Sequence, residues 1–402
     1  MEKVLVTGMG AITSIGNNVD EYWNNLIAGK CGIDKITRID VENHDTVVAA
    51  QIDDTFESLA KKYWTKRQLN AVTGPVRLLL ASAGEAVDDS GVDFSEMDTR
   101  RIAVILAVTD PGYVDAERDT KKNIILKDMA SSAPALISSK YGIHGASYSM
   151  ACACASSGYA ISMSAHLIET GFYDMVITGG LSGFVTHDRL SGFNQILAMS
   201  SNPDPETACR PFSKNRDGFI MGEGAGVLIL ESETSAKKRN AKIYSQLSGY
   251  AFFSEAADMT APMENGEGMR IVMESALEKA GLTINDIDYI NAHGTSTGLN
   301  DKYETFAIKN LFGERAYSIP VSSTKSSIGH TLGAGSALES IASIKALNEG
   351  IIPPTLHYDE PDPELDLDYV PNESRKAELR AVLSNSFGFG GTNAVLIFKK
   401  YN

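Results

Sequence analysis

Cys154 stands in a run of small residues that leads into a predicted helix. The run reads Met-Ala-Cys-Ala-Cys-Ala-Ser-Ser-Gly from Met150 to Gly158, and a helical pattern continues to Glu169 before Gly171 ends it. A helix start carries unpaired N–H groups and partial positive charge, which favours the thiolate, the nucleophilic form of cysteine. Cys154 is therefore a candidate nucleophile. On this stretch alone, a buried structural cysteine is an equally good interpretation.

Three further clusters contain residue types that do chemistry. The first is Asn-Ala-His-Gly-Thr-Ser-Thr-Gly at 291–298, in which a predicted strand ends at His293. The second spans 322–335 and contains Lys325 and His330, and the third is Ser-Asn-Ser-Phe-Gly-Phe-Gly-Gly-Thr-Asn at 384–393. Taken singly, a histidine at a strand end is more often structural, and a glycine-rich loop is more often a tight turn.

The ordered set of motifs resembles the β-ketoacyl-acyl carrier protein synthases, in the elongating branch with a Cys-His-His triad. The resemblance runs from Val4 to Phe398 and includes the signature Arg-Pro-Phe-Ser-Lys-Asn-Arg-Asp-Gly-Phe-Ile-Met-Gly-Glu-Gly-Ala-Gly at 210–226. It implies an α/β protein with a thiolase-like fold, in which two duplicated βαβ-rich halves form a five-layer α/β/α/β/α core. We expect the halves at 1–240 and 241–402, and a dimer.

The resemblance also implies roles for individual residues. Cys154 matches the nucleophile, and we interpret Cys152, two residues earlier, as a structural cysteine. His293 and His330 match the paired histidines, Lys325 the motif lysine, Glu304 the downstream acid and Phe389 the gating phenylalanine. The backbone N–H groups of Cys154 and Phe389 would form the oxyanion hole. The residues expected to contact phosphopantetheine or the acyl chain are Thr295, Thr297, Phe193 and Val108.

The implied reaction is a decarboxylative Claisen condensation. Cys154 takes an acyl group from a carrier-protein thioester, and malonyl carrier protein then loses its carboxylate to give an enolate that attacks the acyl-Cys. The two histidines would stabilise the enolate, while Lys325 and Glu304 would orient and charge-balance them. The substrates arrive on the phosphopantetheine of acyl carrier protein, and the reaction requires no nicotinamide and no metal.

The chain departs from the family pattern in the segment after the predicted strand at 101–108. Many elongating members carry Gly-Ser-Gly-x-Gly-Gly there, whereas this chain has Thr109-Asp-Pro-Gly112 followed by a short loop from Tyr113 to Ser132. Leu197 stands where many members carry an arginine, and the run from Ser254 to Thr260 lacks the family's histidine. Two functions remain equally favoured: housekeeping fatty-acid elongation, and a specialised polyketide or polyene synthase working with a second synthase-like chain.

Other classes of protein fit less well. A non-elongating chain-length partner usually lacks the nucleophile, which this chain keeps. A degradative thiolase would carry a second catalytic cysteine near the carboxyl terminus, and none follows Cys209. A priming synthase of the Cys-His-Asn type would have asparagine in place of His330.

Composition and charge exclude several kinds of binding partner. The net charge of −15 argues against nucleic acid and anionic membranes, and no apolar run reaches the roughly 18–20 residues of a membrane span. The amino terminus lacks a signal-peptide pattern, so we expect a cytoplasmic protein. The four cysteines show neither metal-ligand spacing nor a disulfide pattern. An acidic carrier would dock on a local basic patch, for which the candidates are Lys61, Lys62, Lys66 and Arg67.

Hydrophobic periodicity predicts strands that alternate with helices, as in layered α/β proteins. The stretch at 4–12 predicts a strand that runs into a glycine turn, but Thr13 stands where a dinucleotide-binding fingerprint needs glycine. The segments around Cys154 and His330 share one pattern, a small-residue loop followed by a helix and a glycine, which favours duplicated halves. The other expected strands are 101–108, 174–180, 227–231, 244–250, 287–292, 320–323, 380–385 and 394–398.

Overall fold

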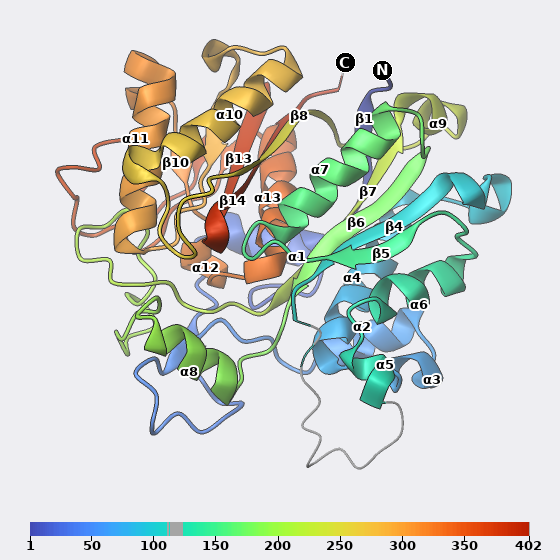
Figure 1. Cartoon of the computed structure of the whole chain (residues 1–402), viewed down its shortest axis with the longest axis horizontal. Helices are drawn as coiled ribbons and strands as arrows, with labels where there is room; N and C mark the ends of the chain where they lie inside the picture. Colours follow the sequence, from blue (N-terminus) through green and yellow to red (C-terminus); the bar gives the residue numbers. More distant parts are fainter. Residues whose placement is uncertain (111, 113–123, 402) are drawn as a thin grey trace.

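The computed structural model describes residues 1–110, 112 and 124–401. Ten of its strands form one hydrogen-bonded sheet, in the order β10-β9-β13-β14-β8-β1-β7-β6-β4-β5. The middle of this order is a weak junction, because β1 and β8 pair only through Val4–Val6 and Ser245–Leu247. The strands therefore form two five-stranded sheets joined at one corner (Figure 1).

The two five-stranded sheets have the same topology. In each, the first strand pairs with the fifth, the fifth with the fourth, the fourth with the second and the second with the third. The two pairings nearest the first strand are antiparallel and the other two are parallel in both sheets. The first sheet contains β1 (Val4–Thr13), β4 (Ile102–Val108), β5 (Ser147–Met150), β6 (Met175–Ser182) and β7 (Gly224–Ser232). The second contains β8 (Ser245–Ser254), β9 (Tyr289–Asn291), β10 (Val321–Ser322), β13 (Ala381–Gly388) and β14 (Thr392–Lys399).

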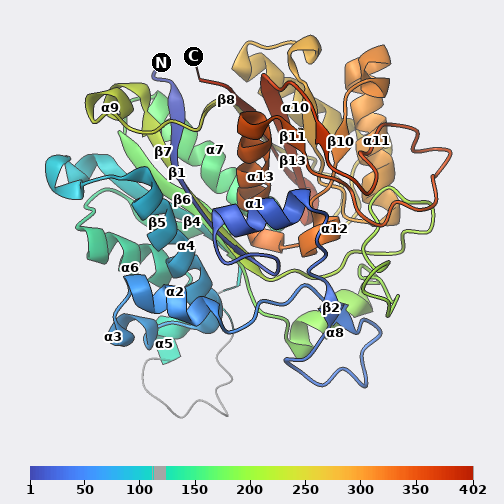
Figure 2. The ribbon, with the colours of Figure 1, turned by 180° about the vertical axis from the view of Figure 1, so that it is seen from behind.

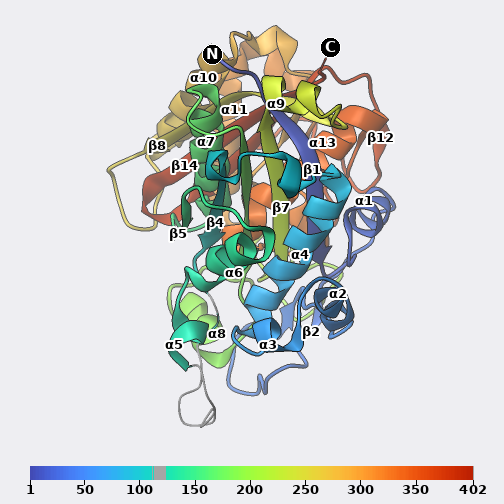
Figure 3. The same cartoon turned by 90° about the vertical axis from the view of Figure 1, so that its right-hand side faces the viewer.

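Helices complete five layers. The helix α4 (Gly74–Ser90) covers the outer face of the first sheet by packing on β1 and β7, as Figure 3 shows. The helices α7 (Ser156–Glu169) and α13 (Gly335–Glu349) lie between the two sheets and contact both. The helix α10 (Glu267–Ala280) packs on β8 and β14, with α11 (Gly298–Phe312) beside it. The expected duplicated five-layer α/β core is confirmed.

The buried apolar residues follow these layers. One cluster joins α7 and α13 to the inner faces of both sheets, a second lies between α4 and the first sheet, and a third lies between the second sheet and α10 and α11. The strand β4 is buried along its whole length, as expected for a parallel strand covered on both faces. The core thus fixes the ends of the parallel strands, near which the candidate catalytic residues lie.

The remaining elements are short and surround this core (Figure 2). The helix α1 contacts the inner helix α13. Lys3 and Tyr401, near the two ends of the described chain, lie side by side, since both contact Glu233. The short elements are α1 (Val19–Ile27), β2 (Asp34–Lys35), β3 (Val48–Ala49), α2 (Phe56–Tyr63), α3 (Lys66–Leu69), α5 (Ile124–Asp128), α6 (Ser132–Tyr141), α8 (His187–Gln195), α9 (Glu233–Lys238), α12 (Lys325–Ile328), β11 (Ile351–Ile352) and β12 (Arg375–Lys376).

The helix boundaries follow ordinary capping chemistry. The Asn18 side chain accepts a hydrogen bond from the Glu21 N–H at the start of α1, and Thr73 does the same for Val76 at the start of α4. Gly91 ends α4 with a left-handed backbone, which glycine adopts at little cost. Polar caps and terminal glycines therefore explain why these helices begin and end where they do.

One prediction from the sequence is wrong at the first strand. The glycines at 8 and 10 do not form a turn, because β1 continues through them to Thr13. A Cβ on Gly10 would lie 2.0 Å from the carbonyl oxygen of Ser82, and one on Gly8 would lie 2.4 Å from that of Ala86. These glycines are needed because α4 approaches β1 closely.

Candidate active site

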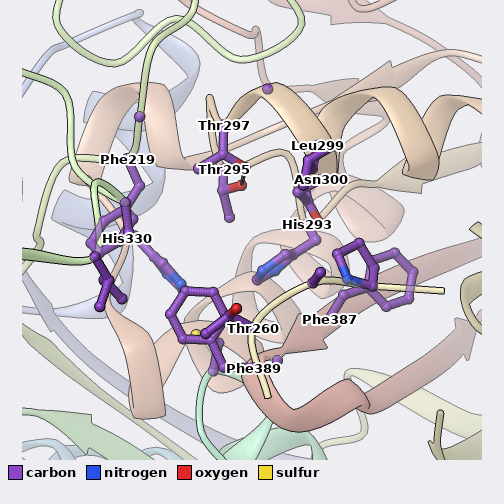
Figure 4. Close-up of a pocket in the computed structure, with 18 of the residues that line it drawn as sticks. Phe219, Thr260, His293, Thr295, Thr297, Leu299, Asn300, His330, Phe387 and Phe389 are labelled. Atoms are coloured by element: carbon purple, nitrogen blue, oxygen red, sulfur yellow. Dashed lines mark hydrogen bonds between the residues drawn. The ribbon is translucent and has the colours of Figure 1, made fainter. Parts of the chain in front are cut away.

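A pocket of about 430 Å³ lies where the two halves meet. Its wall includes Cys154 from the first half and His293, His330 and Phe389 from the second. In Figure 4 the imidazoles of His293 and His330 point their ring nitrogens into the space beside Phe389. The other lining residues include Phe193, Ile196, Leu197, Ala198, Asp217, Phe219, Glu255, Thr260, Thr295, Thr297, Leu299, Asn300, Leu332, Phe387 and Asn393.

A strained turn presents Cys154. Ala153 has φ of 45°, a left-handed conformation that is unfavourable for alanine. The turn is held by the Ser156 hydroxyl, which accepts from the Cys152 N–H at 2.7 Å and donates to the Ala153 carbonyl at 2.6 Å. The helix α7 begins two residues after Cys154, so its amino-terminal N–H groups lie near the thiol.

The protonation state of Cys154 differs from the one predicted. Burial raises the pKa of this thiol to about 11, although the Lys325 ammonium and the backbone N–H of Phe389 act in the opposite direction. The expectation of a thiolate from the helix start alone is therefore wrong for the resting site. Removal of the thiol from water outweighs the charges around it. A reaction at this sulfur would therefore require the thiol to lose its proton.

His293 follows the central strand β9 and is held through its backbone. The Glu304 carboxylate accepts from the N–H groups of His293 and Gly294, both at 2.8 Å, and from the Asn385 side chain at 3.0 Å. Burial raises the pKa of Glu304 to about 7. Glu304 thus binds the main chain of the histidine turn, and not an imidazole nitrogen.

Asp301 supports the same turn from the start of α11. Its carboxylate accepts from the N–H groups of Ser296, at 3.1 Å, and Phe212, at 2.8 Å. Ser296 has φ of 68°, so the turn that carries His293 is strained like the turn that carries Cys154. Asp301 itself faces Arg216, with 3.9 Å between their charged atoms.

His330 follows β10, the edge strand of the second sheet, and the short helix α12. Its Nδ1 accepts a hydrogen bond from the Leu332 N–H at 3.3 Å, so the neutral ring carries its proton on Nε2. Its own backbone N–H donates to the Ile220 carbonyl at 2.6 Å. The Leu332 backbone has φ of 40°, the third strained position next to a candidate catalytic residue.

Five rings form a row of perpendicular contacts through the pocket. The two imidazoles lie 5.3 Å apart at 84°, and Phe219 meets His330 at 5.3 Å and 83°. Phe193 continues the row beyond Phe219, and Phe387 meets His293 from the other side. Edge-to-face contacts of this kind are favourable and directional, so the row fixes the ring planes of both histidines.

Lys325 lies behind the histidines and does not line the pocket. Its ammonium is buried and forms an ion pair with Glu339 of α13. Burial, followed by the charge of Lys325, holds the pKa of His293 and of His330 well below the ordinary value of histidine. Both rings are therefore neutral at neutral pH. The Nδ1 atom of His293 is buried and has no hydrogen-bond partner among the described residues.

Phe389 lies in the turn between β13 and β14. Gly390 and Gly391 in this turn have φ of 75° and 65°. A neighbouring loop braces the turn, because the Gly390 N–H donates to Met259 at 2.8 Å and the Glu255 N–H donates to Gly391 at 3.0 Å. The Glu255 carboxylate also accepts from the Asn393 side chain at 2.7 Å.

The other predicted site residues are distributed as follows. Thr295 and Thr297 line the pocket with their hydroxyl oxygens 2.9 Å apart, and Phe193 lines it as well. Val108 is buried in the core cluster beneath α4 and is not part of the pocket wall. The basic residues at 61, 62, 66 and 67 are exposed on α2 and α3, outside the pocket wall. Residues 111 and 113–123 of the altered loop lie outside the described residues.

Sequence reasoning missed several residues that support the site. Glu339 is the partner of Lys325, and its signal was a lone acid in the apolar helical run at 335–347. Asn385 lies inside a quoted motif, but its contact with Glu304 joins two segments 81 residues apart. Phe219 and Phe387 also lie inside quoted motifs, but their ring contacts could not be predicted, because ring packing depends on the fold. Among the described residues, no three histidine, cysteine or acidic side chains gather as a metal site, and no helix has the length and apolar character to cross a membrane.

The chain belongs to the β-ketoacyl synthase family, whose members are condensing acyltransferases. The model of the β-ketoacyl synthase N-terminal domain matches residues 1–236, and that of the C-terminal domain matches residues 244–359. The thiolase-like fold predicted from the resemblance is confirmed by the solved structures of ketosynthases that superimpose on the chain.

Particular relatives match along the whole chain. The 3-oxoacyl-[acyl-carrier-protein] synthase 2 of Staphylococcus aureus is 39% identical over 414 residues, which cover 100% of this chain and 99% of that protein. The ishigamide ketosynthase/chain length factor superimposes with a TM-score of 0.92 at 33% identity, covering 100% of both chains. AntDE:AntF, a type II polyketide acyl-carrier protein in complex with its ketosynthase, gives a TM-score of 0.88 at 30% identity and also covers 100% of both chains.

The charge of Lys325 yields a prediction about the histidines. Replacing it by methionine removes a positive charge that lowers the pKa of both rings, so we expect both pKa values to rise toward that of an ordinary histidine. NMR titration of ring-labelled protein measures the shift. Lys345→Met is the matched control, because Lys345 pairs with Glu349 on the same helix as Glu339. Unchanged values in Lys325→Met would contradict the electrostatic account.

Proposed function

We propose that the protein is a β-ketoacyl-acyl carrier protein synthase that elongates an acyl group held on Cys154. The observation that carries this proposal is the convergence of one half-buried thiol and two neutral imidazoles in a single pocket whose wall is largely aromatic and aliphatic. A thiol can hold an acyl group covalently, and neutral imidazoles can donate N–H bonds to a developing oxyanion.

In the first half-reaction Cys154 exchanges thioesters. Its sulfur attacks the carbonyl carbon of an acyl group on the carrier's phosphopantetheine, and the proton of the Cys154 thiol ends on the departing pantetheine thiol. The backbone N–H groups of Cys154 and Phe389, both directed at the thiol, would bind the oxyanion of the tetrahedral intermediate. The products are acyl-Cys154 and free carrier thiol, so no other reactant is needed.

In the second half-reaction malonyl carrier protein loses carbon dioxide. The electron pair of the broken bond becomes an enolate, whose oxygen would accept hydrogen bonds from the Nε2–H of His330 and from His293. The enolate carbon then attacks the acyl-Cys154 carbonyl, and the cysteine leaves as a thiolate that takes up a proton. Loss of one such donor costs about 10²–10³ in rate.

Lys325, Glu304 and Glu339 are positioning residues in this mechanism. Burial keeps the pKa of both imidazoles low and the charge of Lys325 lowers it further, while Glu339 compensates that charge in the buried interior. Glu304 fixes the main chain of His293 and Gly294. None of the three lines the pocket, which agrees with an indirect role.

The carrier's phosphopantetheine is the only prosthetic group that the proposal requires. Thr295 and Thr297 would bind its amide groups, because their hydroxyls line the pocket wall. Acyl carrier protein is the proposed partner. The acyl chain would lie against the apolar side of the pocket, where Phe193 and Phe219 pack together.

The halves 1–240 and 241–402 would act as two structural units that together form one site.

A dimer is also part of the proposal. The strand β5 supports a dimer, because β5 is the edge of the first sheet and is exposed or half-buried along its length. An open edge strand is a ready template for pairing with another chain. The partner would be a second copy or a related synthase-like chain.

A second candidate function is a specialised polyketide or polyene ketosynthase that works with such a related chain. It is favoured by the superposition on the ishigamide ketosynthase/chain length factor and by the unusual turn from Thr109 to Gly112. A non-elongating chain-length partner is a third alternative, which the presence of Cys154 and both histidines disfavours.

The test is a product analysis by mass spectrometry. The purified protein is incubated with malonyl carrier protein and saturated or polyunsaturated acyl carrier proteins, with Cys154→Ala alongside. We expect wild-type protein to extend an acyl chain by two carbons and Cys154→Ala to extend none. Extension of unsaturated chains alone would favour the specialised function. Absence of product from every substrate would contradict self-sufficient elongation.

The basic residues on α2 and α3 are the proposed docking site for the acidic carrier. Changing Lys66 and Arg67 together to glutamate should raise the KM for carrier substrates roughly fivefold or more at low salt, with a smaller effect at high salt. Lys237 and Lys238 provide the matched control, since they are also adjacent and exposed on a short helix, α9, far from α3 (Figure 1). An equal KM in the two double variants would place docking elsewhere.

A further inference from the structure

Asp110 lies at the first-half counterpart of the position that carries His293. His293 follows β9, the second strand of its sheet, and the turn of Thr109 and Asp110 follows β4, the second strand of the other sheet. The carboxyl ends of central parallel strands are where α/β proteins place functional side chains. The residues here are not the glycines of the family pattern, so we expect this chain to have a different turn after β4.

Asp110 forms an ion pair with Arg189 of α8. The Nε atom of Arg189 lies 3.3 Å from Oδ2 of Asp110, and the two side chains are only 12% and 15% exposed. Both ends are anchored further: Asp110 accepts from the Gly112 N–H at 2.8 Å, and Arg189 donates to the Phe184 carbonyl at 3.1 Å. The pair thus ties the end of β4 to the beginning of α8.

The turn of Thr109 and Asp110 packs against two glycines, where any side chain would collide with it. A Cβ on Gly183 would lie 2.7 Å from Nη1 of Arg189 and 2.9 Å from Oδ2 of Asp110. A Cβ on Gly333 would lie 2.7 Å from the Thr109 hydroxyl. Gly333 belongs to the turn three residues after His330. The altered turn is therefore packed between α8 and the segment that carries His330.

The helix α8 forms part of the wall of the pocket. Arg189 and Phe193 are four residues apart and lie on the same side of the helix. Phe193 lines the pocket, packs on Phe219 and belongs to the apolar cluster that also contacts Cys154. Residues 196–198, which follow α8 directly, line the pocket too. The position of α8 therefore sets how much apolar space lies beside the nucleophile.

We propose that the Asp110–Arg189 pair determines acyl-chain length selectivity by fixing α8 against the end of β4. Both residues are positioning residues, since neither lines the pocket. This inference rests on the proposed function, because it concerns the acyl group that Cys154 would accept. With the pair intact, the wall at Phe193 is held inward and long chains are excluded. With the pair broken, α8 is free to move outward and the site admits longer chains.

The test is a double-mutant cycle with Asp110→Asn, Arg189→Met and the combined variant. The quantity measured is kcat/KM for acylation of Cys154 by butyryl and by dodecanoyl carrier protein, read by intact-protein mass. Each single variant should raise the ratio of the dodecanoyl to the butyryl kcat/KM about tenfold. An apolar pocket typically discriminates by about this factor between acyl chains that differ by one or two methylene groups. The combined variant should show the same ratio as the single variants, because residues that act as a pair are not additive.

The control is Glu231→Gln, which breaks the buried Glu231–Arg239 pair at the far end of β7. It should lower the melting temperature without changing the ratio, so a general loss of stability is separated from selectivity. Arg189→Lys is the milder variant if a single change prevents folding, and it should shift the ratio in the same direction. An unchanged ratio in folded variants overturns the inference. Failure of wild-type protein to acylate with either substrate overturns the proposed function instead.

Discussion

The buried ion pair between Lys325 and Glu339 is the interaction on which the site depends. Lys325 lowers the pKa of Cys154, His293 and His330, so one ammonium influences all three groups of the proposed mechanism. An unpaired ammonium in this interior would be costly, and breaking a buried pair typically costs about 3–5 kcal/mol. Glu339 of α13 supplies the compensating charge, and burial raises the pKa of its carboxyl.

The duplicated topology explains why the residues of the proposed mechanism come from different halves. Cys154 lies between β5 and α7, and His330 lies between β10 and α13, which are equivalent places in the two sheets. Because α7 and α13 pack together between the sheets, the two segments face each other across the junction. One topology thus supplies the proposed nucleophile from the first half and the two histidines from the second, and the strained turns hold them in place.

Much of the fold followed from the sequence, because the buried parallel strands and the capped helices leave strong local patterns. The error at the glycines of β1 arose because close packing against α4 and a turn both require glycine. The motif residues could be proposed as a site, but the roles assigned to them stay predictions. The partner of Lys325, the row of rings and the Asp110–Arg189 pair could not be foreseen, because they join segments far apart in the chain. The protonation state predicted for Cys154 was wrong because a helix start in the sequence does not indicate how far the thiol is removed from water.

The proposed mechanism assigns the two half-reactions to different groups, and the His330→Ala variant separates them. Wild-type and variant proteins are given acyl carrier protein, and the acyl mass on the Cys154 peptide is measured. Carbon dioxide release from labelled malonyl carrier protein is then followed. We expect the variant to acquire the acyl group on Cys154 as the wild type does, while carbon dioxide release falls about 10²–10³-fold. Undiminished carbon dioxide release, or an acyl group located on Cys152, would contradict the proposal that the Cys154 thiol holds the acyl group while the histidines stabilise the enolate.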